Sequence, residues 1–445
     1  MKKQRHHIIQ FVCIFAVLVA VMLQGFTKAV KMEPLKGFTK EEKPVTLNFK
    51  TYWDGSYQDY LTEHAKQNTG FREFFIRNYN QVCYSCFNKI TNKNIVKGYR
   101  QELYLKMYLD EVTGKKLEQT YHDVETAKTA ARKNVESTLA LIDTLRKHGT
   151  EFLFVFAPTK PAVYPEMMPK QYQKQIAGFS LEAYYIELFK ENNIPHIDFY
   201  HHFQDLKNTF PYPLYPRTGT HWSESVIPYV ADTILKKMES LTSYKLPSIQ
   251  YLDDNLTTEY SVQDGELEAS MNLLFPLNKP ALPRPVFTLT DTLNTDKPNL
   301  LVICDSYFTQ LRISPFVKAF NHWDCWVYNR DINSSRPYYN EKHLNMIFDA
   351  AEVIEDADIV MAVFTAPMLY DYMFNFTNTA QELLQKGKMD DHEALQVIIQ
   401  NILDTPEWLE AIEKQAEELG ITAEENIRRN AEYVLKKNKQ KKNPQ

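Results

Sequence analysis

Continuous apolar runs constrain the fold of this 445-residue chain more tightly than any other feature of its sequence. Outside the N-terminal segment, three such runs stand out, EFLFVFAP (151–158), NLLVICDSYF (299–308) and DADIVMAVFTAP (356–367). A strand buried on both faces has no polar side, so runs of this kind are typical of parallel sheets covered by helices. Amphipathic helical patterns at 124–149, 180–193 and 341–356 alternate with them. The sequence therefore predicts a three-layer α/β fold with a parallel sheet.

Shorter patterns complete this region and set its limits. Strands are expected at 194–200 and 324–329, and a helix at 224–238. Residues 241–297, with the proline-rich stretch PLNKPALPRP, are expected to be irregular. The predicted organisation is a membrane segment (1–30), a stalk and mostly helical lead-in (31–120), an α/β domain (121–380) and a C-terminal helical extension (381–445).

The N-terminus has the composition of a membrane segment. After the basic head MKKQRHH, residues 8–26 are apolar apart from Gln10, Gln24 and Gly25. At 1.5 Å per residue, this run spans roughly 28 Å, about one hydrocarbon core. No A-x-A cleavage site follows it. We expect an uncleaved, single-pass signal-anchor in the cytoplasmic (inner) membrane, with the body in the periplasm or outside the cell; a cleaved signal is the alternative.

Composition argues against several classes of function. Lys plus Arg total 51 and Asp plus Glu total 56, a net charge of −5, whereas a nucleic-acid binder carries a basic stripe. Neither GxGxxG nor GxxxxGK[ST] occurs, so no nucleotide-phosphate loop is expected. The five cysteines show no zinc-type spacing. We expect neither a cofactor nor a metal.

Polar residues follow two of the buried strands. Asp305 and Ser306 come directly after one run, and Thr159 and Lys160 follow another. A third segment, RTGTHWSES (217–225), stands just before a helix. Ligands of open α/β sheets bind at the carboxyl ends of the strands, so these segments are expected to meet at one edge. There the N–H of Ser306 is placed to stabilise an oxyanion.

A serine nucleophile needs a base, and His221 is the best candidate among the histidines. The spacing of these residues alone supports a purely structural role equally well. His221 is then a helix-entry residue packed by Trp222, and Asp305–Ser306 a plain strand-to-loop turn.

Taken in order, the motifs YPRTGTHW and ICDSYF resemble those of the alginate O-acetyltransferase family (AlgJ/AlgX type), which has an SGNH-hydrolase-like fold. WDGSYQDYLTEH, GFREFFIRNYN, APTKPAVYPEMMP and DADIVMAVF also look like their counterparts, so the resemblance covers roughly residues 50 to 375. The serine block follows the histidine block, as in that circularly permuted family. The resemblance implies an SGNH-like domain over 121–380, with Ser306 as nucleophile and His221 as base.

One departure concerns the third member of the triad. The family commonly has T-D-T-H-W around its histidine, and here Gly219 stands where that aspartate would be. Glu224, Asp305 or a backbone carbonyl could orient His221 instead; otherwise the site is a Ser–His dyad or inactive. Lys160 and Trp222 are further candidates for support.

These features lead to an expected function with alternatives. The first is an exported, membrane-anchored O-acetyltransferase that acts on a cell-envelope or extracellular polysaccharide through an acyl-serine. By resemblance, a multi-pass membrane acyltransferase would supply the acyl donor. The alternatives are a catalytically impaired scaffold or glycan-binding subunit of an acetylation complex, and a carbohydrate esterase.

Overall fold

The computed structural model describes residues 2–37, 44–290, 296–336, 342–344, 350–387 and 390–442. It consists of two compact units. The first comprises Met1–Lys106, Arg217–Gly219 and Gly265–Pro280, and the second Met107–Pro216, Thr220–Asp264 and Ala281–Gln445.

A seven-stranded sheet organises the second unit, in the order β10-β9-β8-β7-β11-β3-β4. The strands are β3 (Glu151–Ala157), β4 (His196–Asp198), β7 (Leu300–Cys304), β8 (Trp323–Val327), β9 (Asp331–Ser334), β10 (Lys342–His343) and β11 (Ile359–Thr365). From β8 to β4 neighbouring strands pair in parallel, whereas β9 and β10 are antiparallel additions at one edge. The predicted parallel sheet is therefore confirmed.

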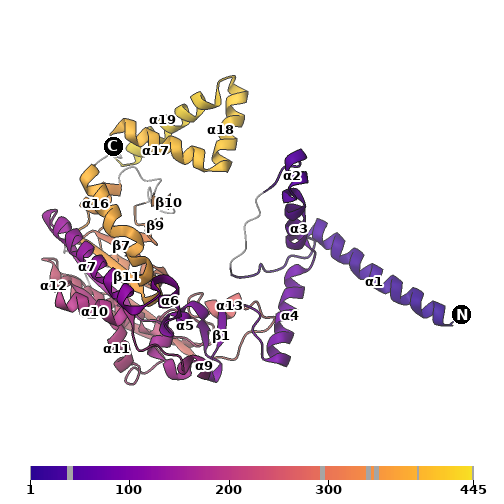
Figure 1. The fold of residues 1–445 in the computed structure, drawn as a ribbon, viewed down its shortest axis with the longest axis horizontal. Coiled ribbons are helices and arrows are strands. Elements are labelled where there is room, and N and C mark those ends of the chain that lie inside the picture. Colours follow the sequence, from indigo (N-terminus) through magenta and orange to yellow (C-terminus); the bar gives the residue numbers. More distant parts are fainter. Residues whose placement is uncertain are drawn as a thin grey trace. The chain divides into compact units, whose positions relative to one another are not determined.

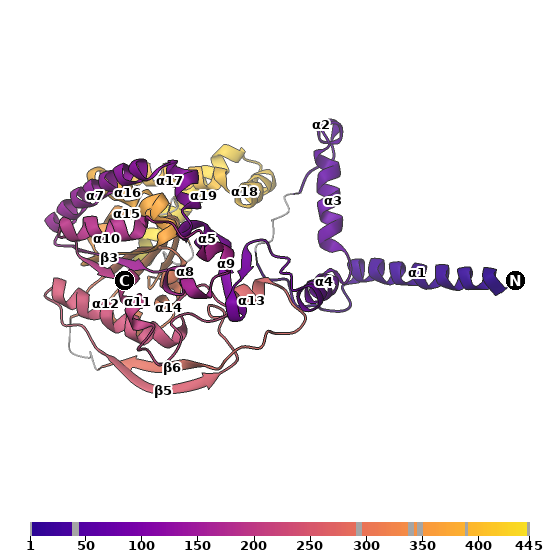
Figure 2. The ribbon, with the colours of Figure 1, turned by 60° about the horizontal axis from the view of Figure 1, so that its bottom comes forward.

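Helices cover both faces of this sheet (Figures 1 and 2). One layer holds α7 (Val124–Lys147), α10 (Leu181–Glu191), α15 (Ala350–Glu355) and α16 (Phe376–Lys386). The other holds α11 (Phe199–Leu206), α12 (Ile227–Leu241) and α14 (Thr309–Arg312). Short helices connect these elements: α5 (Lys106–Val112), α6 (Lys115–Tyr121), α8 (Lys160–Val163) and α9 (Lys170–Gln173). The three-layer α/β prediction is confirmed.

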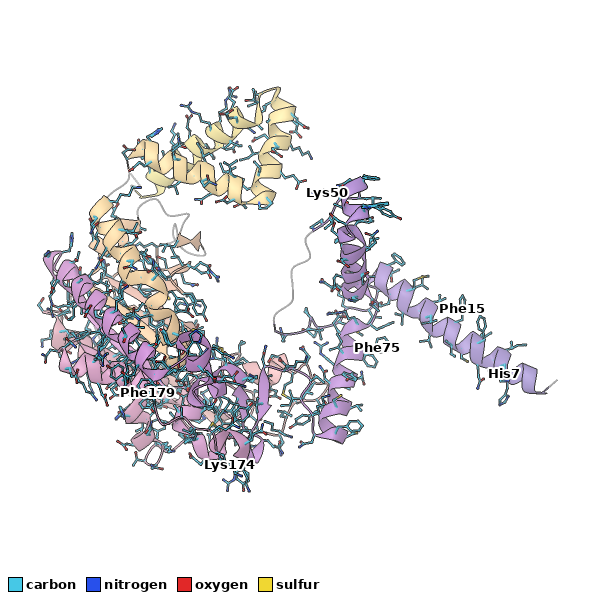
Figure 3. The ribbon with its side chains drawn as sticks, in the orientation of Figure 1. His7, Phe15, Lys50, Phe75, Lys174 and Phe179 are labelled. Atoms are coloured by element: carbon cyan, nitrogen blue, oxygen red, sulfur yellow. The ribbon has the colours of Figure 1, made fainter. Side chains whose placement is uncertain are left out.

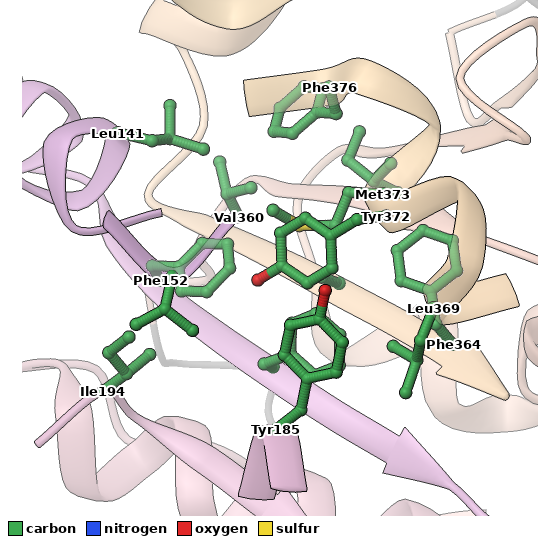
Figure 4. Close-up of a cluster of buried hydrophobic side chains, with 14 of the residues drawn as sticks. Leu141, Phe152, Tyr185, Ile194, Val360, Phe364, Leu369, Tyr372, Met373 and Phe376 are labelled. Carbon is green, nitrogen blue, oxygen red and sulfur yellow. The ribbon is translucent and has the colours of Figure 1, made fainter. Parts of the chain in front are cut away.

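The largest described core cluster lies between the sheet and the α7/α10/α16 layer (Figure 4). Phe152, Phe154 and Phe156 of β3 point into it. The alternating residues Leu153 and Val155 are also completely buried, on the opposite face. Burial on both faces is the reason why this segment is apolar without interruption.

Two sequence predictions were wrong in this unit. Residues 241–297 include β5 (Ile249–Thr257) and β6 (Leu282–Leu289), which form an antiparallel pair. Pro283 and Pro285 lie two residues apart in β6, so the N–H groups that they lack would both face the same edge of the strand, and a strand with one unpaired edge tolerates this. The helix expected at 341–356 is present only as α15, because β10 pairs with β9; residues 345–349 lie outside the described part.

The predicted C-terminal helices are confirmed as α17 (Asp391–Asp404), α18 (Pro406–Leu419) and α19 (Ala423–Lys442). They share a small apolar cluster of their own, which includes Ile398, Ile402, Ile412 and Ala431.

The first unit contains α1 (Lys2–Thr27), α2 (Phe49–Trp53), α3 (Ser56–Asn68), α4 (Arg72–Phe87) and α13 (Glu266–Ser270). A hairpin of β1 (Ile95–Lys97) and β2 (Leu103–Leu105) interrupts the lead-in that we expected to be mostly helical. His6–Thr27 is long and apolar enough to cross a membrane. This helix has the character of either a signal-anchor or a signal peptide.

Candidate active site

Ser306 lies at the carboxyl end of β7, where the apolar run gives way to a polar turn. Asp305 caps the short 3-10 helix Ser306–Phe308, and its Oδ1 accepts a hydrogen bond from the N–H of Tyr307 at 2.9 Å. Aspartate is a favoured N-cap because its short carboxylate reaches the free N–H groups of the first turn. The turn leaves Ser306 partly exposed while its neighbours on both sides are buried.

His221 is brought to this serine from a loop that precedes the 3-10 helix Glu224–Val226. Its Nε2 lies 2.9 Å from Ser306 Oγ, a normal hydrogen-bonding distance. The two residues are 85 positions apart in sequence. The structure thus brings together the residues that the sequence suggested as nucleophile and base.

Asp305 is only 2% exposed, and its carboxylate is held by three donors. Besides the Tyr307 N–H, its Oδ2 accepts from Thr365 N at 2.8 Å and from Thr365 Oγ1 at 2.7 Å. Burial raises the pKa of Asp305, while these hydrogen bonds and nearby His221 oppose the increase. Asp305 therefore ties the nucleophile turn to the end of β11.

Tyr307 connects the turn that carries Ser306 with the loop that carries His221. Its hydroxyl donates to the carbonyl of Thr220 at 2.7 Å, just before His221. Its ring centroid lies 4.9 Å from that of His221 and 5.3 Å from that of Trp222. Tyr307 therefore holds the loop that carries His221.

Trp222 and Lys160, both predicted as possible support, are buried and hold the histidine loop. Trp222 is fully buried and packs against Phe199 and Phe203 as well as Tyr307. Lys160 is 1% exposed, and its Nζ donates to the carbonyl of Pro216 at 2.7 Å.

Glu224 is directed to a different partner. Its Oε2 lies 3.5 Å from Arg284 Nε, and its own N–H donates to Asp264 Oδ1 at 3.2 Å. Gly219 is buried, and its φ lies outside the left-handed region that favours glycine. Backbone geometry therefore does not require a glycine there.

Tyr328, at the end of β8, is a further neighbour of Ser306 that the sequence did not single out. Its N–H donates to Cys304 O at 2.8 Å, and its φ is 55°. Burial and Asp305 raise the pKa of the Tyr328 phenol, whereas hydrogen bonds with Ser306 lower it.

Sequence reasoning missed Tyr307, Thr365 and Tyr328. Thr365 ends β11 and Tyr328 directly follows β8, so the strand-end rule that selected Ser306 would have selected both. Among the described residues, no group of three or more His, Cys, Asp or Glu side chains is arranged to hold a metal ion.

Comparisons with known proteins found one family model that is similar to part of this chain. Residues 117–297 match the model of the family described as "SGNH hydrolase-like domain, acetyltransferase AlgX". The matched segment contains His221, and Ser306 follows its end. No curated protein matches the sequence.

Several solved structures are similar at low sequence identity. The O-acetyltransferase domain of Pseudomonas putida AlgJ is 14% identical, with a TM-score of 0.39, over 64% of this chain and 99% of that chain. Pseudomonas aeruginosa AlgX is 14% identical, with a TM-score of 0.41, over 65% and 68%. Bacillus cereus PatB1 is 13% identical, with a TM-score of 0.35, over 56% and 93%. Residues 117–297 of this chain are therefore similar to the SGNH hydrolase-like domain of the AlgX acetyltransferases.

Proposed function

We propose that this protein is an exported, membrane-anchored O-acetyltransferase that transfers an acetyl group to hydroxyls of a cell-envelope or extracellular polysaccharide. The observation that carries the proposal is the 2.9 Å contact between His221 Nε2 and Ser306 Oγ at the carboxyl edge of the sheet. The AlgX-family match of residues 117–297 supports acetyl transfer as the chemistry.

In the first half-reaction, Ser306 Oγ attacks the carbonyl carbon of an acetyl ester while His221 Nε2 takes the hydroxyl proton. The N–H of Ser306 donates to the oxyanion of the tetrahedral intermediate. The carbon–oxygen bond to the donor then breaks, and His221 returns the proton to the leaving alcohol. An acetyl-serine ester and a deacetylated donor result.

In the second half-reaction, a sugar hydroxyl attacks the acetyl-serine carbonyl as His221 removes its proton. The bond between the acetyl carbon and Ser306 Oγ breaks, and His221 reprotonates the serine. If water takes the place of the sugar, the same steps hydrolyse the ester, so the acceptor alone distinguishes a transferase from an esterase.

The glycine at position 219, in place of the family's aspartate, should change the rate of acetyl transfer but not the sequence of its steps. In serine proteases, replacing the triad aspartate by asparagine lowers kcat about 10⁴-fold because the imidazole loses its orientation and tautomer. Here the ring of Tyr307 packs against His221, and its hydroxyl holds the preceding carbonyl. We propose that these contacts help to orient the imidazole.

The proposal extends to the location of the protein and to its supply of acetyl groups. Helix α1 would remain as a single-pass anchor in the cytoplasmic membrane, with the second unit outside it. A multi-pass membrane acyltransferase would deliver the acetyl donor, and the acceptor would be a polysaccharide.

Mass spectrometry of the protein incubated with an activated acetyl ester tests the nucleophile. We expect an adduct of one acetyl group on Ser306 in the wild type, none on Ser306→Ala, and a wild-type yield from Ser240→Ala, which alters an exposed serine of α12. Equal acetylation of Ser306→Ala would overturn the assignment. No adduct on the wild type would favour the scaffold alternative.

Products made with and without an oligosaccharide test the acceptor. Acetylated sugar in preference to free acetate supports transfer. Acetate alone, at a rate that the oligosaccharide does not change, supports an esterase.

A further inference from the structure

Helix α4 carries an apolar stripe that faces away from its own unit. Phe75, Tyr79 and Val82 are 48%, 62% and 50% exposed, and Cys86 continues the same stripe. The spacing of three and four residues places all four on one side of the helix. The opposite side contains the buried residue Asn80, whose amide donates to the carbonyl of Met271 in the same unit.

Helix α2 adds exposed aromatic side chains. Phe49 and Trp53 are 82% and 79% exposed, and their rings stack with centroids 5.9 Å apart. Tyr52 between them is 58% exposed. Tryptophan and tyrosine collect where a membrane meets water, because one part of the side chain is apolar and the other is polar.

Two glycines join this helical region to α1. A Cβ on Gly70 would lie 2.0 Å from Val21 O, and one on Gly25 would lie 2.8 Å from Asn68 O, so the two backbones are in direct contact. The last residue of α1 is Thr27, and Val21 lies six positions earlier. At 1.5 Å per residue, the contact is about 9 Å inside the end of the apolar helix.

That depth corresponds to the boundary between headgroups and acyl chains when α1 spans a bilayer. From this contact, α3 and α4 run across the end of α1 rather than along it (Figures 1 and 2). Figure 3 shows Phe75 on α4 and Phe15 on α1 within this unit.

A hollow of about 460 Å³ lies at the same junction. Its charged lining residues are Lys28, Lys31 and Glu73, so cations outnumber the one carboxylate, and its polar lining includes Gln24, Asn68 and Thr69. Ammonium groups next to an apolar helix end suit the phosphate of a lipid headgroup.

We propose that α2 and α4 form a membrane-surface face whose exposed apolar side chains enter the headgroup–acyl boundary of the bilayer that α1 spans. The inference rests on the anchor assigned in the proposed function and is independent of the acetyl-transfer chemistry. The bilayer is the favoured occupant because the Gly25–Gly70 contact fixes the face at the depth of the end of α1.

Spin labelling of the full-length chain in lipid nanodiscs tests the proposal. The native thiol of Cys86 is exposed on the stripe, and Cys13→Ser removes the other exposed cysteine among the described residues. The collision rates of the label with oxygen, which partitions into lipid, and with a water-soluble nickel chelate give its depth. The matched control carries the label at Ala140→Cys, on the exposed side of α7, in a Cys86→Ser background.

We expect the Cys86 label to favour oxygen several-fold over the chelate and the α7 label to show the reverse. Replacing Val82 by glutamate should increase the chelate collisions at Cys86 several-fold, whereas Val82→Leu should leave them unchanged. A Cys86 label as accessible to the chelate as the α7 label would overturn the proposal. So would a mature protein that lacks residues 1–27.

Two further outcomes would assign the face to a protein instead. A short distance between Cys86 labels in nanodiscs that hold two chains would place a second copy there. Shielding from both oxygen and the chelate, only when another membrane protein is co-reconstituted, would place that protein there. Ser306→Ala should give the same label accessibilities as the wild type, so a failure of the chemistry and a failure of this face are distinguishable.

Discussion

Replacing Thr365 by valine tests whether the buried carboxyl group of Asp305, next to Ser306, is ionised in the folded protein. Thr365 Oγ1 donates to Asp305 Oδ2 at 2.7 Å, and both residues are almost fully buried. Valine has nearly the same shape but lacks the hydroxyl. The substitution therefore removes one donor from the carboxylate and changes little else.

Hydrogen bonds to charged groups contribute roughly 1.5–3 kcal/mol to stability. We therefore expect Thr365→Val to lower the free energy of unfolding by about 2 kcal/mol at neutral pH. With an unfolding entropy of about 2.1 cal/mol/K per residue and a few hundred residues, the thermal midpoint should fall by roughly 3 °C.

The loss should depend on pH in a defined direction. Burial raises the pKa of Asp305 above 3.8, and removing a donor raises it further. A carboxyl group with a raised pKa holds its proton more tightly in the folded state. Its contribution to the free energy of unfolding therefore falls as pH rises from about 3.8 through the folded-state pKa, and is constant above it. The Thr365→Val deficit should be largest on that upper plateau and shrink as the pH is lowered.

Urea unfolding between pH 4.5 and pH 8, followed by the fluorescence of the buried Trp222 and Trp326, measures this dependence. Thr150→Val is the matched control, because Thr150 is equally buried but donates to a carbonyl, Ala357 O, at 2.7 Å. The control should cost about 1 kcal/mol at every pH. A Thr365→Val deficit that follows the control at all pH values would refute the charged state of Asp305.

Substitutions at three further positions, Tyr307, Glu111 of α5 and Gly219, test other contacts and the triad position. Tyr307→Phe removes the donor to Thr220 O, so it should cost about 1 kcal/mol in urea unfolding and slow Ser306 acetylation in a mass-spectrometric time course. Burial raises the pKa of Glu111 from 4.5 to about 7, so the wild type should lose stability as pH rises across this range. Glu111→Gln should not lose stability in this way. Its free energy of unfolding relative to the wild type should therefore increase by roughly 3 kcal/mol between pH 4 and pH 8.5, which urea unfolding at each pH measures. Gly219→Asp should acetylate at least 10-fold faster than Gly219→Asn if a carboxylate at this position orients His221; equal rates would contradict that role.

The sheet was predictable because burial on two faces leaves no choice of residue type. Every residue from Phe152 to Ala157 is buried, and the whole of β11 is buried as well, so neither strand has a polar face. The β5–β6 pair was not predicted because it is not buried on two faces. Most of β5 is exposed, so its side chains follow no apolar alternation, and its pairing depends on a partner more than twenty residues away.

The candidate site was predictable only where the chemistry of single residues pointed to it. Ser306 and His221 were selected by residue type and by their place beside predicted elements, and the structure puts their reactive atoms 2.9 Å apart. The interactions that fix this geometry are tertiary. Tyr307 and Thr365 act through partners 87 and 60 positions distant, and although the end of a predicted strand indicates Thr365, the sequence does not indicate which partner either residue has.

Three consecutive residues make the hydrogen bonds that hold this site together. Asp305 binds the end of β11, Ser306 contacts His221, and Tyr307 holds the loop of His221 through the carbonyl of Thr220. The first and third are buried, whereas the serine between them is partly exposed. The position of His221 is therefore coupled to the same turn that carries Ser306. A change in either buried neighbour should alter the Ser306–His221 distance, whichever group orients the far side of the imidazole.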